Sequence, residues 1–478
     1  MRKISILMVA LLVLTACKET KKEVDESTSE IEVQNMEPIS DAVLETAVIY
    51  EANIRQYSPE GTFNAFTEDI PSLKNLGVKI IWLMPIHPIS EVKRKAKGDL
   101  SIEEIEDPEE RKKYLGSYYS VADYNAVNPD FGTKDDFRKL VQTAHANGMY
   151  VILDWVPNHT GWDHQWITDH PEYYTKNEAG EITDPLNDEG EPWGWTDVAD
   201  LDYNNLEMQQ EMISEMSYWI SEEGVDGFRC DVAHGVPVSF WEKAIPELRK
   251  VKPIFMLAEA QMPALTKGDM FEMSYGWKGH HILNAIAQGK QNVADFDSYI
   301  NEIPQEWESN DILMNFVTNH DENSWAGPVA ERMGDAAPAL TALTYCMPGM
   351  PLIYSGQEYD LDFRLKFFEK DSIPKTRGTM WPLLEQLGTL KNEHPALNGG
   401  KTPASYERVE TSNEYILAFK RIQDDNELIY IANLSGTSAQ FTIPLTGAFT
   451  NYMTDLPVTF QEGFQQEYAP WEYVILIK

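Results

Sequence analysis

Acidic side chains and one arginine stand at the ends of four short apolar segments of this sequence. The segment ending in DWVPNHT carries Asp154, and the one ending in GFRCDVAH carries Arg229 and Asp231. LAEA carries Glu259 in its third position, and FVTNHDEN carries Asp321. A lone aspartate in such a place is usually a cap or an ion-pair partner, but burying several anions together is costly without cations. We therefore interpret the set as a catalytic cluster, able to supply a nucleophile and a proton donor.

Eight apolar runs must position these residues. Their hydrophobicity is too continuous for strands that expose one face to solvent. Continuous hydrophobicity is expected of parallel strands covered on both faces. The runs are Val48–Ile54, Ile80–Ile86, Val151–Val156, Gly227–Ala233, Ile254–Ala260, Phe271–Trp277, Leu313–Asn319 and Met350–Gly356. Amphipathic helical patterns separate most of them, at Asp135–Asn147, Leu206–Glu222, Pro237–Lys250 and Ala336–Cys346. Eight such units predict an α/β fold, a closed (β/α)8 TIM barrel whose strand ends meet at one pocket.

Three segments depart from the barrel pattern, which we assign to residues 43–400. Residues 157–205 are polar, rich in Trp and Pro and too long for an ordinary loop, so they predict a domain inserted after the third strand. Glu91–Tyr114 is a charged loop after the second strand, favoured as a solvated excursion. Residues 401–478 change to short alternating runs, which predict a C-terminal antiparallel β-sandwich.

The N-terminus indicates export. Arg2 and Lys3 precede an apolar stretch too short to span a bilayer, and Leu14-Thr15-Ala16-Cys17 is similar to a bacterial lipobox. We interpret residues 1–17 as a lipoprotein signal peptide and residues 18–42 as a disordered tether. The protein is then expected to be anchored in the outer membrane through lipid on Cys17, at the cell surface or the periplasmic face. The alternative is an ordinary secretory signal with an incidental cysteine.

Net charge and cysteine content exclude several function classes. The formal net charge of −38 repels phosphate backbones and argues against nucleic acid, whereas a neutral polymer is compatible with it. Beyond Cys17 there are only Cys230 and Cys346, too few for a disulfide framework or a zinc site. Both lie in apolar runs, so we expect buried, inert thiols.

The short motifs, taken in order, resemble those of the α-amylase family, glycoside hydrolase family thirteen. DWVPNH, GFRCD, the glutamate after the fifth strand, and NHD are similar to its four short regions, and LDYNN at 201–205 is similar to a fifth in the inserted domain. The resemblance implies a retaining glycosidase that acts on α-glucans. Asp231 would be the nucleophile, Glu259 the general acid/base, and Asp321 the stabiliser of the transition state.

The resemblance also implies an electrostatic arrangement. The carboxyls of Asp231 and Glu259 should lie about 5–5.5 Å apart, without a water between them. Arg229, two residues before the nucleophile, should lie on the same strand face and lower the pKa of Asp231, while Asp154 supports the arginine. Glu259 must hold a proton at the working pH.

Substrate contacts follow from the same motifs. Tyr119, in GSYYSVADY, is similar to the family tyrosine that stacks under the reacting sugar, and His159 and His320 to histidines that hydrogen-bond that sugar. Many members have Lys-His where this chain has His234-Gly235, so the subsites for the leaving group are expected to differ. His234 either replaces the lysine or packs. Trp193, Trp195 and Trp277 are candidates for stacking platforms, or for packing.

A calcium ion is implied less directly. Asn158 and Asp200 match the family positions that bind Ca2+, with the backbone carbonyl of Gly235, and oxygen donors suit this hard cation. Without a metal, Asn158 would brace the inserted loop.

Three functions remain open from the sequence. The leading one is hydrolysis of starch, maltodextrins or related α-linked oligosaccharides. The alternatives are transglycosylation or isomerisation through the same covalent intermediate, and a catalytically inactive surface glycan-binding lipoprotein. The intact acids argue against the last.

Overall fold

The computed structural model describes residues 36–98, 100–187 and 190–478. The predicted signal peptide with Cys17, and the tether as far as residue 35, lie outside the described residues. Over the ranges that are described, no helix combines the length and the apolar character needed to cross a bilayer.

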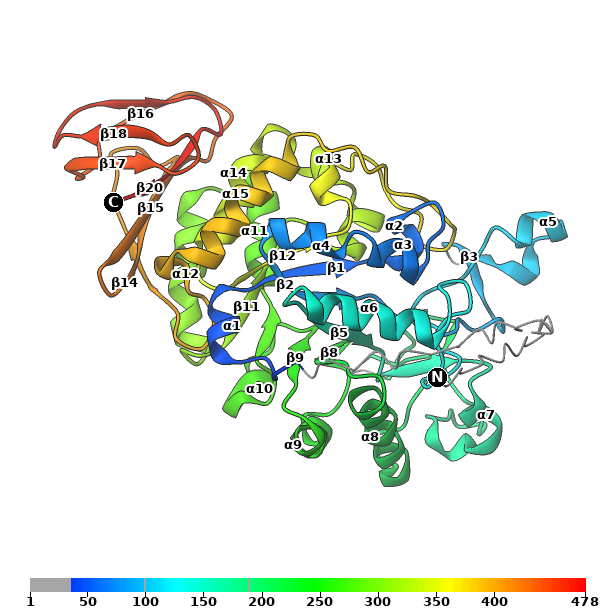
Figure 1. The fold of residues 1–478 in the computed structure, drawn as a ribbon. Helices are drawn as coiled ribbons and strands as arrows, with labels where there is room; N and C mark the ends of the chain where they lie inside the picture. The colour runs from blue at the N-terminus through cyan, green and yellow to red at the C-terminus, as the bar shows by residue number, and fades with distance from the viewer. Residues whose placement is uncertain (1–35, 99, 188–189) are drawn as a thin grey trace, which may run out of the picture. The chain divides into compact units, whose positions relative to one another are not determined.

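Eight parallel strands close into a barrel in the order β1-β2-β5-β8-β9-β10-β11-β12 (Figure 1). They are β1 Val48–Ala52, β2 Val78–Leu83, β5 Tyr150–Trp155, β8 Gly227–Cys230, β9 Phe255–Ala258, β10 Met273–Tyr275, β11 Ile312–Asn315 and β12 Met350–Tyr354. Nearly every residue in them is buried, as the continuous apolar runs predicted. The predicted (β/α)8 barrel is confirmed. Most runs continue past the end of their strand, into the loops that carry the acidic residues.

Helices surround the barrel (Figure 1). The longer ones are α6 Lys134–Ala146, α8 Leu206–Ser221, α9 Val238–Val251, α11 Trp277–Ala287, α12 Val293–Glu306, α14 Ala337–Cys346 and α15 Met380–Glu393. Their starts follow from local chemistry. Thr133 and Asp136 form a reciprocal capping box at α6, and Asn205 accepts the first free N–H groups of α8.

A short helix, α1 (Asp41–Thr46), precedes the first strand. The buried Glu45 accepts hydrogen bonds from the N–H groups of Gly400 (2.9 Å) and Thr402 (2.6 Å). Met36 and Ile39 pack against the apolar interior of the barrel. Within the described residues, the packed part of the chain therefore includes residues before 43, because two apolar side chains of the otherwise polar segment are partly buried there.

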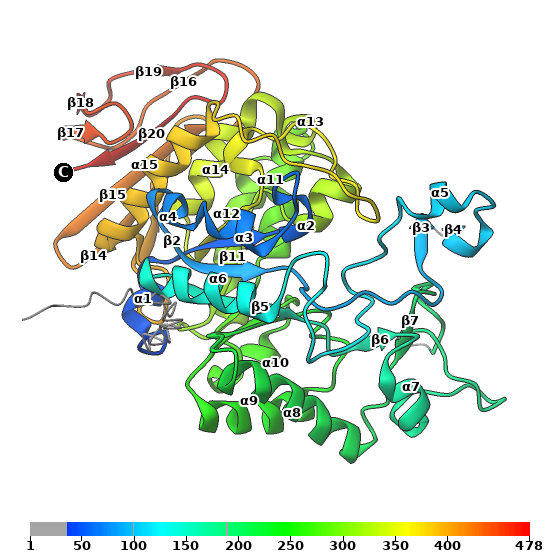
Figure 2. The same ribbon diagram turned by 45° about the vertical axis from the view of Figure 1, so that its right-hand side comes forward.

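Two insertions extend from the barrel on the same side (Figure 2). In the loop after β5, β6 (His159–Gly161) pairs with β7 (Val198–Asp200). The helix α7 (Gln165–Asp169) lies between these two strands in the sequence. The charged loop after β2 contains the β3–β4 ribbon and a short helix, α5. These are β3 Lys95–Lys97, β4 Leu100–Ser101 and α5 Pro108–Arg111.

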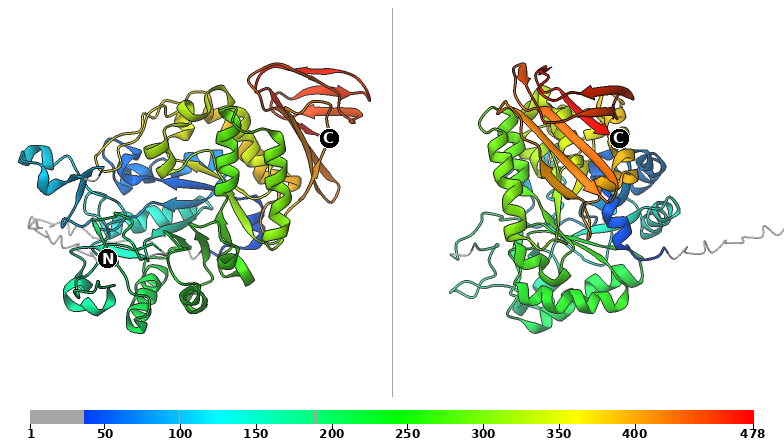
Figure 3. Two further views of the ribbon diagram at one scale, coloured as in Figure 1. Left: turned by 180° about the vertical axis from the view of Figure 1, so that it is seen from behind. Right: turned by 90° about the vertical axis from the view of Figure 1, so that its left-hand side faces the viewer.

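The C-terminal residues form a six-stranded antiparallel sheet and a two-stranded ribbon around their own apolar cluster. The sheet has the order β13 Ser405–Arg408, β14 Ile416–Gln423, β15 Asn426–Asn433, β20 Tyr473–Ile477, β17 Gly447–Asn451 and β18 Leu456–Phe460, and the ribbon is β16 Ala439–Phe441 with β19 Gln466–Tyr468. Arg421 donates to the Cys346 carbonyl at 2.8 Å, which ties the sheet to α14. This domain lies at the end of the barrel away from the β3 and α7 insertions (Figure 3).

Candidate active site

Arg229 organises the acidic cluster at the end of β8. The side chain is fully buried, and Nη1 donates to Asp154 Oδ1 (2.7 Å) and Asp231 Oδ1 (2.9 Å). Nη2 lies 2.7 Å from Glu259 Oε1, but without hydrogen-bond geometry, so this contact is an ion pair only. Nε donates to the Tyr275 hydroxyl at 3.1 Å. One guanidinium thus contacts three carboxylates from three neighbouring strands.

The carboxyl groups of Asp231 and Glu259 both contact the Arg229 guanidinium, and each shifts the pKa of the other. An inverting glycosidase holds its two acids farther apart, with room for a water between them. Glu259 Oε2 also accepts a hydrogen bond from the Val232 N–H at 2.8 Å. The arrangement is that of a nucleophile and a proton donor that share one reacting bond.

The sequence predicted that Glu259 holds a proton, but the pKa shifts of the two residues favour the proton on Asp231. Burial, and then the nearby Glu259, raise the pKa of Asp231 well above its ordinary value. Burial acts to raise the pKa of Glu259 as well, but Arg229 and the Val232 N–H outweigh it, and that pKa is lowered. As predicted, Arg229 acts to lower the pKa of Asp231, but burial and the neighbouring Glu259 outweigh it, so the net shift is upward.

Val232, directly after the proposed nucleophile, has a backbone φ of +42°. A β-branched side chain is strained in this region, which glycine adopts freely. The strain turns the Val232 N–H toward Glu259, so a cost in backbone energy holds the acid in place.

His320 connects the cluster to the opposite wall. Its Nδ1 lies 2.5 Å from Glu51 Oε1, and its Nε2 lies 2.8 Å from the Tyr119 hydroxyl and 3.4 Å from Asp321 Oδ2. Burial disfavours the charged ring, but Asp321 and Glu51 raise the pKa of His320 to about 9. His320 is therefore an imidazolium at neutral pH, whereas burial lowers the pKa of His159 to about 4 and keeps that ring neutral.

A cavity of about 420 Å3 opens over these groups. Asp231, Glu259, Asp321 and His320 line it, together with Tyr119 and His159. The sequence-predicted residues that bind substrate are thus brought together with the predicted catalytic ones, apart from those described next.

His234 and Trp277 lie outside this cavity. His234 is exposed, and its Nδ1 is 3.4 Å from the Glu259 carbonyl oxygen, at the rim next to the acid. Trp277 packs on Phe316 and His281. Trp195 lines the cavity, and Trp193, 54% exposed, stacks on it with ring centroids 5.6 Å apart.

The predicted calcium donors come from three segments: Asn158 immediately precedes β6, Asp200 ends β7, and Gly235 lies in the loop after β8. His159 pairs with Asp200 across β6 and β7. Gly235 lies so close that a Cβ there would be 2.8 Å from Asn158 Oδ1. Burial raises the pKa of Asp200 to about 6, as expected for a carboxylate with little compensating positive charge. The donor set fits a hard cation.

Several residues of the site were missed from the sequence. Glu51 lies inside an apolar run, and a charge in a predicted buried strand was a usable signal. Lys95, Trp325, Phe367 and Phe368 also line the cavity, from three different loops, and their spacing in the sequence carries no motif.

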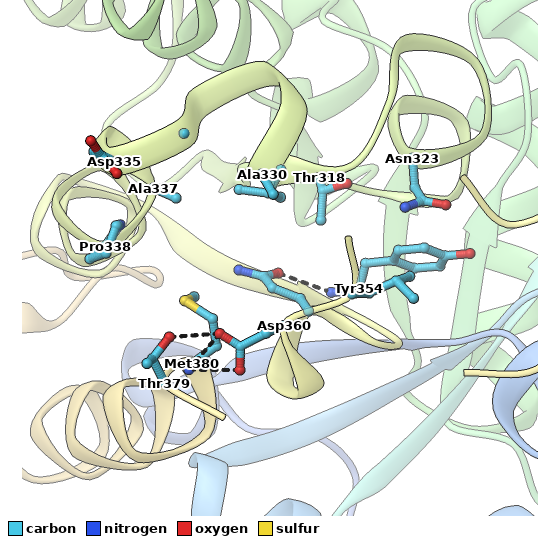
Figure 4. A pocket seen from close by; sticks show the side chains of 14 residues that line it. Thr318, Asn323, Ala330, Asp335, Ala337, Pro338, Tyr354, Asp360, Thr379 and Met380 are labelled. Carbon is cyan, nitrogen blue, oxygen red and sulfur yellow. Dashed lines mark hydrogen bonds between the residues drawn. The ribbon is translucent and has the colours of Figure 1, made fainter. Parts of the chain in front are cut away.

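A second cavity, of about 300 Å3, lies behind the ends of β11 and β12 (Figure 4). Two carboxylates, Asp335 and Asp360, line it, and Asp360 accepts hydrogen bonds from the Thr379 hydroxyl and the Met380 N–H, which caps α15. Thr318 and Tyr354 add to a lining that is mainly apolar. This cavity has no facing pair of carboxyls, so we assign it no chemistry.

Several known proteins are similar to this chain over most of its length. A family model described as "Alpha amylase, catalytic domain" matches residues 24–378. Alpha-amylase MalA of Haloarcula japonica is 23% identical over 84% of this chain and 57% of its own. An alpha-1,4-glucan:maltose-1-phosphate maltosyltransferase of Rhodospirillum rubrum is 26% identical, over 82% and 58%. The chain thus spans less than two thirds of these two relatives. The crystal structure of an alpha-amylase from Lactobacillus plantarum superposes with a TM-score of 0.78 at 29% identity, covering 92% of this chain and all (100%) of the other.

Proposed function

Because the chain belongs to the α-amylase family, we propose that it is a retaining glycosidase that hydrolyses α-glucans such as starch and maltodextrins. The observation that carries this is the direct pairing of the Asp231 and Glu259 carboxyls on one guanidinium, Arg229. In the first step an Asp231 oxygen attacks the anomeric carbon. The bond to the leaving oxygen breaks, and Glu259 donates its proton to that oxygen.

The second step reverses these roles. Glu259, now ionised, takes a proton from a water, whose oxygen attacks the anomeric carbon and displaces Asp231. The sugar leaves with a hydroxyl of retained configuration, and Glu259 regains its proton. Asp321, exposed to the cavity, and the negative cluster around it stabilise the positive charge that develops on the sugar.

Transfer to a second sugar is the alternative fate of the same intermediate. The relative from Rhodospirillum rubrum is named a maltosyltransferase, so this outcome is compatible with the family. It differs from hydrolysis only in whether a sugar hydroxyl or a water attacks in the second step.

Release of reducing ends from maltoheptaose by the wild type and by Asp231→Asn tests the proposal. We expect release by the wild type and a loss of at least about a thousandfold in the variant. Longer chains or isomers without net new reducing ends would instead establish transfer. Equal inertness of both proteins on every α-glucoside tried would leave a glycan-binding protein.

Calcium binding by Asn158, Asp200 and the Gly235 carbonyl is part of the proposal. The supporting observation is the close approach of Asn158 Oδ1 to Gly235. A bound ion would hold the inserted loop against the loop after β8. Among the described ranges, no group of three His, Cys, Asp or Glu side chains is arranged for a metal, and with one carboxylate we expect modest affinity.

Anchoring to the bacterial outer membrane through Cys17 is likewise proposed, from the lipobox-like sequence alone. Radiolabelled palmitate incorporated into the wild type but not into Cys17→Ser would support it, and label in neither would contradict it.

A further inference from the structure

The position of the acid defines the two directions of the substrate. Glu259 follows β9, the fifth strand, so the leaving group must extend past β9. In a glucopyranose the 4-hydroxyl lies across the ring from the anomeric carbon, so the donor chain continues away from Glu259. The strand opposite β9 in the closed barrel is β1, flanked by β2 and β12. The loops after β2 and β12 therefore face the non-reducing end of the donor.

These two loops are joined to each other through their backbones. Tyr114 forms a β-bridge with Glu369, and the Leu115 N–H donates to the Phe368 carbonyl at 2.6 Å. The two segments, residues 114–119 and 366–369, are called here the donor-side wall. Because these bonds link backbone to backbone, the donor-side wall is continuous at the place where an α-glucan chain would otherwise pass.

Arg55, buried behind the wall, holds both segments. Its Nη1 donates to the carbonyls of Gly116 and Phe367, each at 3.0 Å, and its guanidinium lies over the Tyr118 ring, 3.8 Å from the centroid. Gln56 Nε2 donates to the carbonyls of Lys366 (2.7 Å) and Glu369 (2.8 Å). Groups with so many partners resist displacement by a passing sugar.

The next gap, between the loop after β2 and the inserted domain, is closed by an ion pair. Lys95, 8% exposed, lies 3.7 Å from Asp197 and donates to the Gly194 carbonyl at 3.0 Å. Both partners belong to the insertion after β5, and Lys95 and Asp197 both line the cavity. On the far side, Trp325 from the loop after β11 packs on Phe367, with centroids 5.1 Å apart.

The acid side is open by contrast. His234, beside the acid, is exposed, whereas Glu259 itself keeps only 14% of its side-chain surface. We propose that the active site is a pocket closed at the donor end, which admits only the non-reducing end of an α-glucan and releases one or two glucosyl units at each cut. The volume of about 420 Å3 suits a short saccharide end rather than a chain running through. This exo action rests on the proposed hydrolytic function.

A blocked chain end tests the inference on the wild type. The probes are 4-nitrophenyl α-maltoheptaoside and the same compound with an ethylidene group on its non-reducing glucose. We expect the free compound to give nitrophenyl products shortened by one or two units, and the blocked one to react at least about a hundredfold more slowly. Similar rates on the two compounds would overturn the closed pocket but leave the proposed hydrolytic function standing. No reaction with either, or with any α-glucan, would overturn both proposals.

Opening the ion pair tests the structural cause. Lys95→Ala should raise the ratio of blocked to free cleavage by about tenfold, since it removes the cation between the loop and the inserted domain. Lys97→Ala is the matched control, because Lys97 is exposed two residues along the same strand. An unchanged ratio in the folded Lys95→Ala protein, checked by its circular dichroism, would overturn the role of the ion pair.

Discussion

Replacing Glu51 by glutamine should remove one of the two negative charges, with that of Asp321, that keep His320 protonated. Glu51 is fully buried on β1, and its Oε1 lies 2.5 Å from His320 Nδ1. Glutamine keeps the shape and an acceptor for the Nδ1 hydrogen but removes the negative charge. Once the ring is neutral with its hydrogen on Nδ1, its Nε2 has none left to donate toward the pocket.

The size of the effect follows from the pKa of His320. The change from 6.5 to about 9 corresponds to about 3 kcal/mol in favour of the charged ring. Asp321 still raises the pKa of His320 in the variant, so we take a return to 6.5 as the upper limit of the change. At that limit about 3% of the rings are charged at pH 8, against about 90% in the wild type. At pH 5.5 both are mostly charged. We expect the loss in kcat/KM to be larger at pH 8 than at pH 5.5, by up to roughly thirtyfold.

Stability should show the same titration. The folded pKa of His320 lies above the unfolded value, so protonation stabilises the fold fully below about pH 6.5, and that contribution disappears as pH rises through about 9. The wild type should therefore lose unfolding free energy over this window, and Glu51→Gln should lose less.

The assay is reducing-end release from maltoheptaose between pH 5 and 8.5, with urea unfolding at the same pH values. Glu45→Gln is the matched control, because Glu45 is also buried but accepts hydrogen bonds from the N–H groups of Gly400 and Thr402 and does not contact His320. Parallel pH profiles for wild type and Glu51→Gln would refute the reasoning, as would the same change in the control.

Three further predictions concern the acid, the strained residue and the metal. Glu259→Gln should lose about 10²–10⁴ in rate on maltoheptaose but still react with α-glucosyl fluoride, whose leaving group needs no proton; full activity on starch would be incompatible with its role. Val232→Gly should be more stable in urea than Val232→Ala by about 1 kcal/mol, since φ at this position is +42°, and the opposite order would show that no strain is stored. Millimolar Ca2+ should raise the Tm of the wild type but not of Asp200→Asn, measured calorimetrically; equal shifts would remove the site from these residues.

The barrel could be predicted because the features that specify it lie in consecutive residues of the sequence. A strand covered on both faces needs a continuous apolar run, and the acids follow these runs directly, as in GFRCD. The ends of parallel strands meet at one place whatever the details of packing. Asp231, Glu259 and Asp321 therefore converge as expected.

The donor-side wall could not be predicted, for an equally physical reason. Its closing bonds join backbone atoms, such as the Leu115 N–H and the Phe368 carbonyl, which are present in every residue and leave no mark on the sequence. Arg55 binds carbonyl groups far apart in the chain, so its spacing to them is set by the fold alone. Glu51 differs from these residues, because a charged residue inside an apolar run can be recognised in the sequence.

The location of the shared proton also depends on distances that a sequence does not contain. The contacts link five carboxyls to two cations, so the cluster stays negative even with one proton retained. The carboxyls are Asp154, Asp231, Glu259, Asp321 and Glu51, and the cations are Arg229 and His320. Burial and then repulsion from Glu259 raise the pKa of Asp231, and a sugar between the two carboxyls would weaken the repulsion. Asp231 keeps its hydrogen bond from Arg229, whereas the Glu259 contact with Arg229 lacks that geometry. We therefore expect substrate itself to shift the proton to Glu259, where the first step needs it.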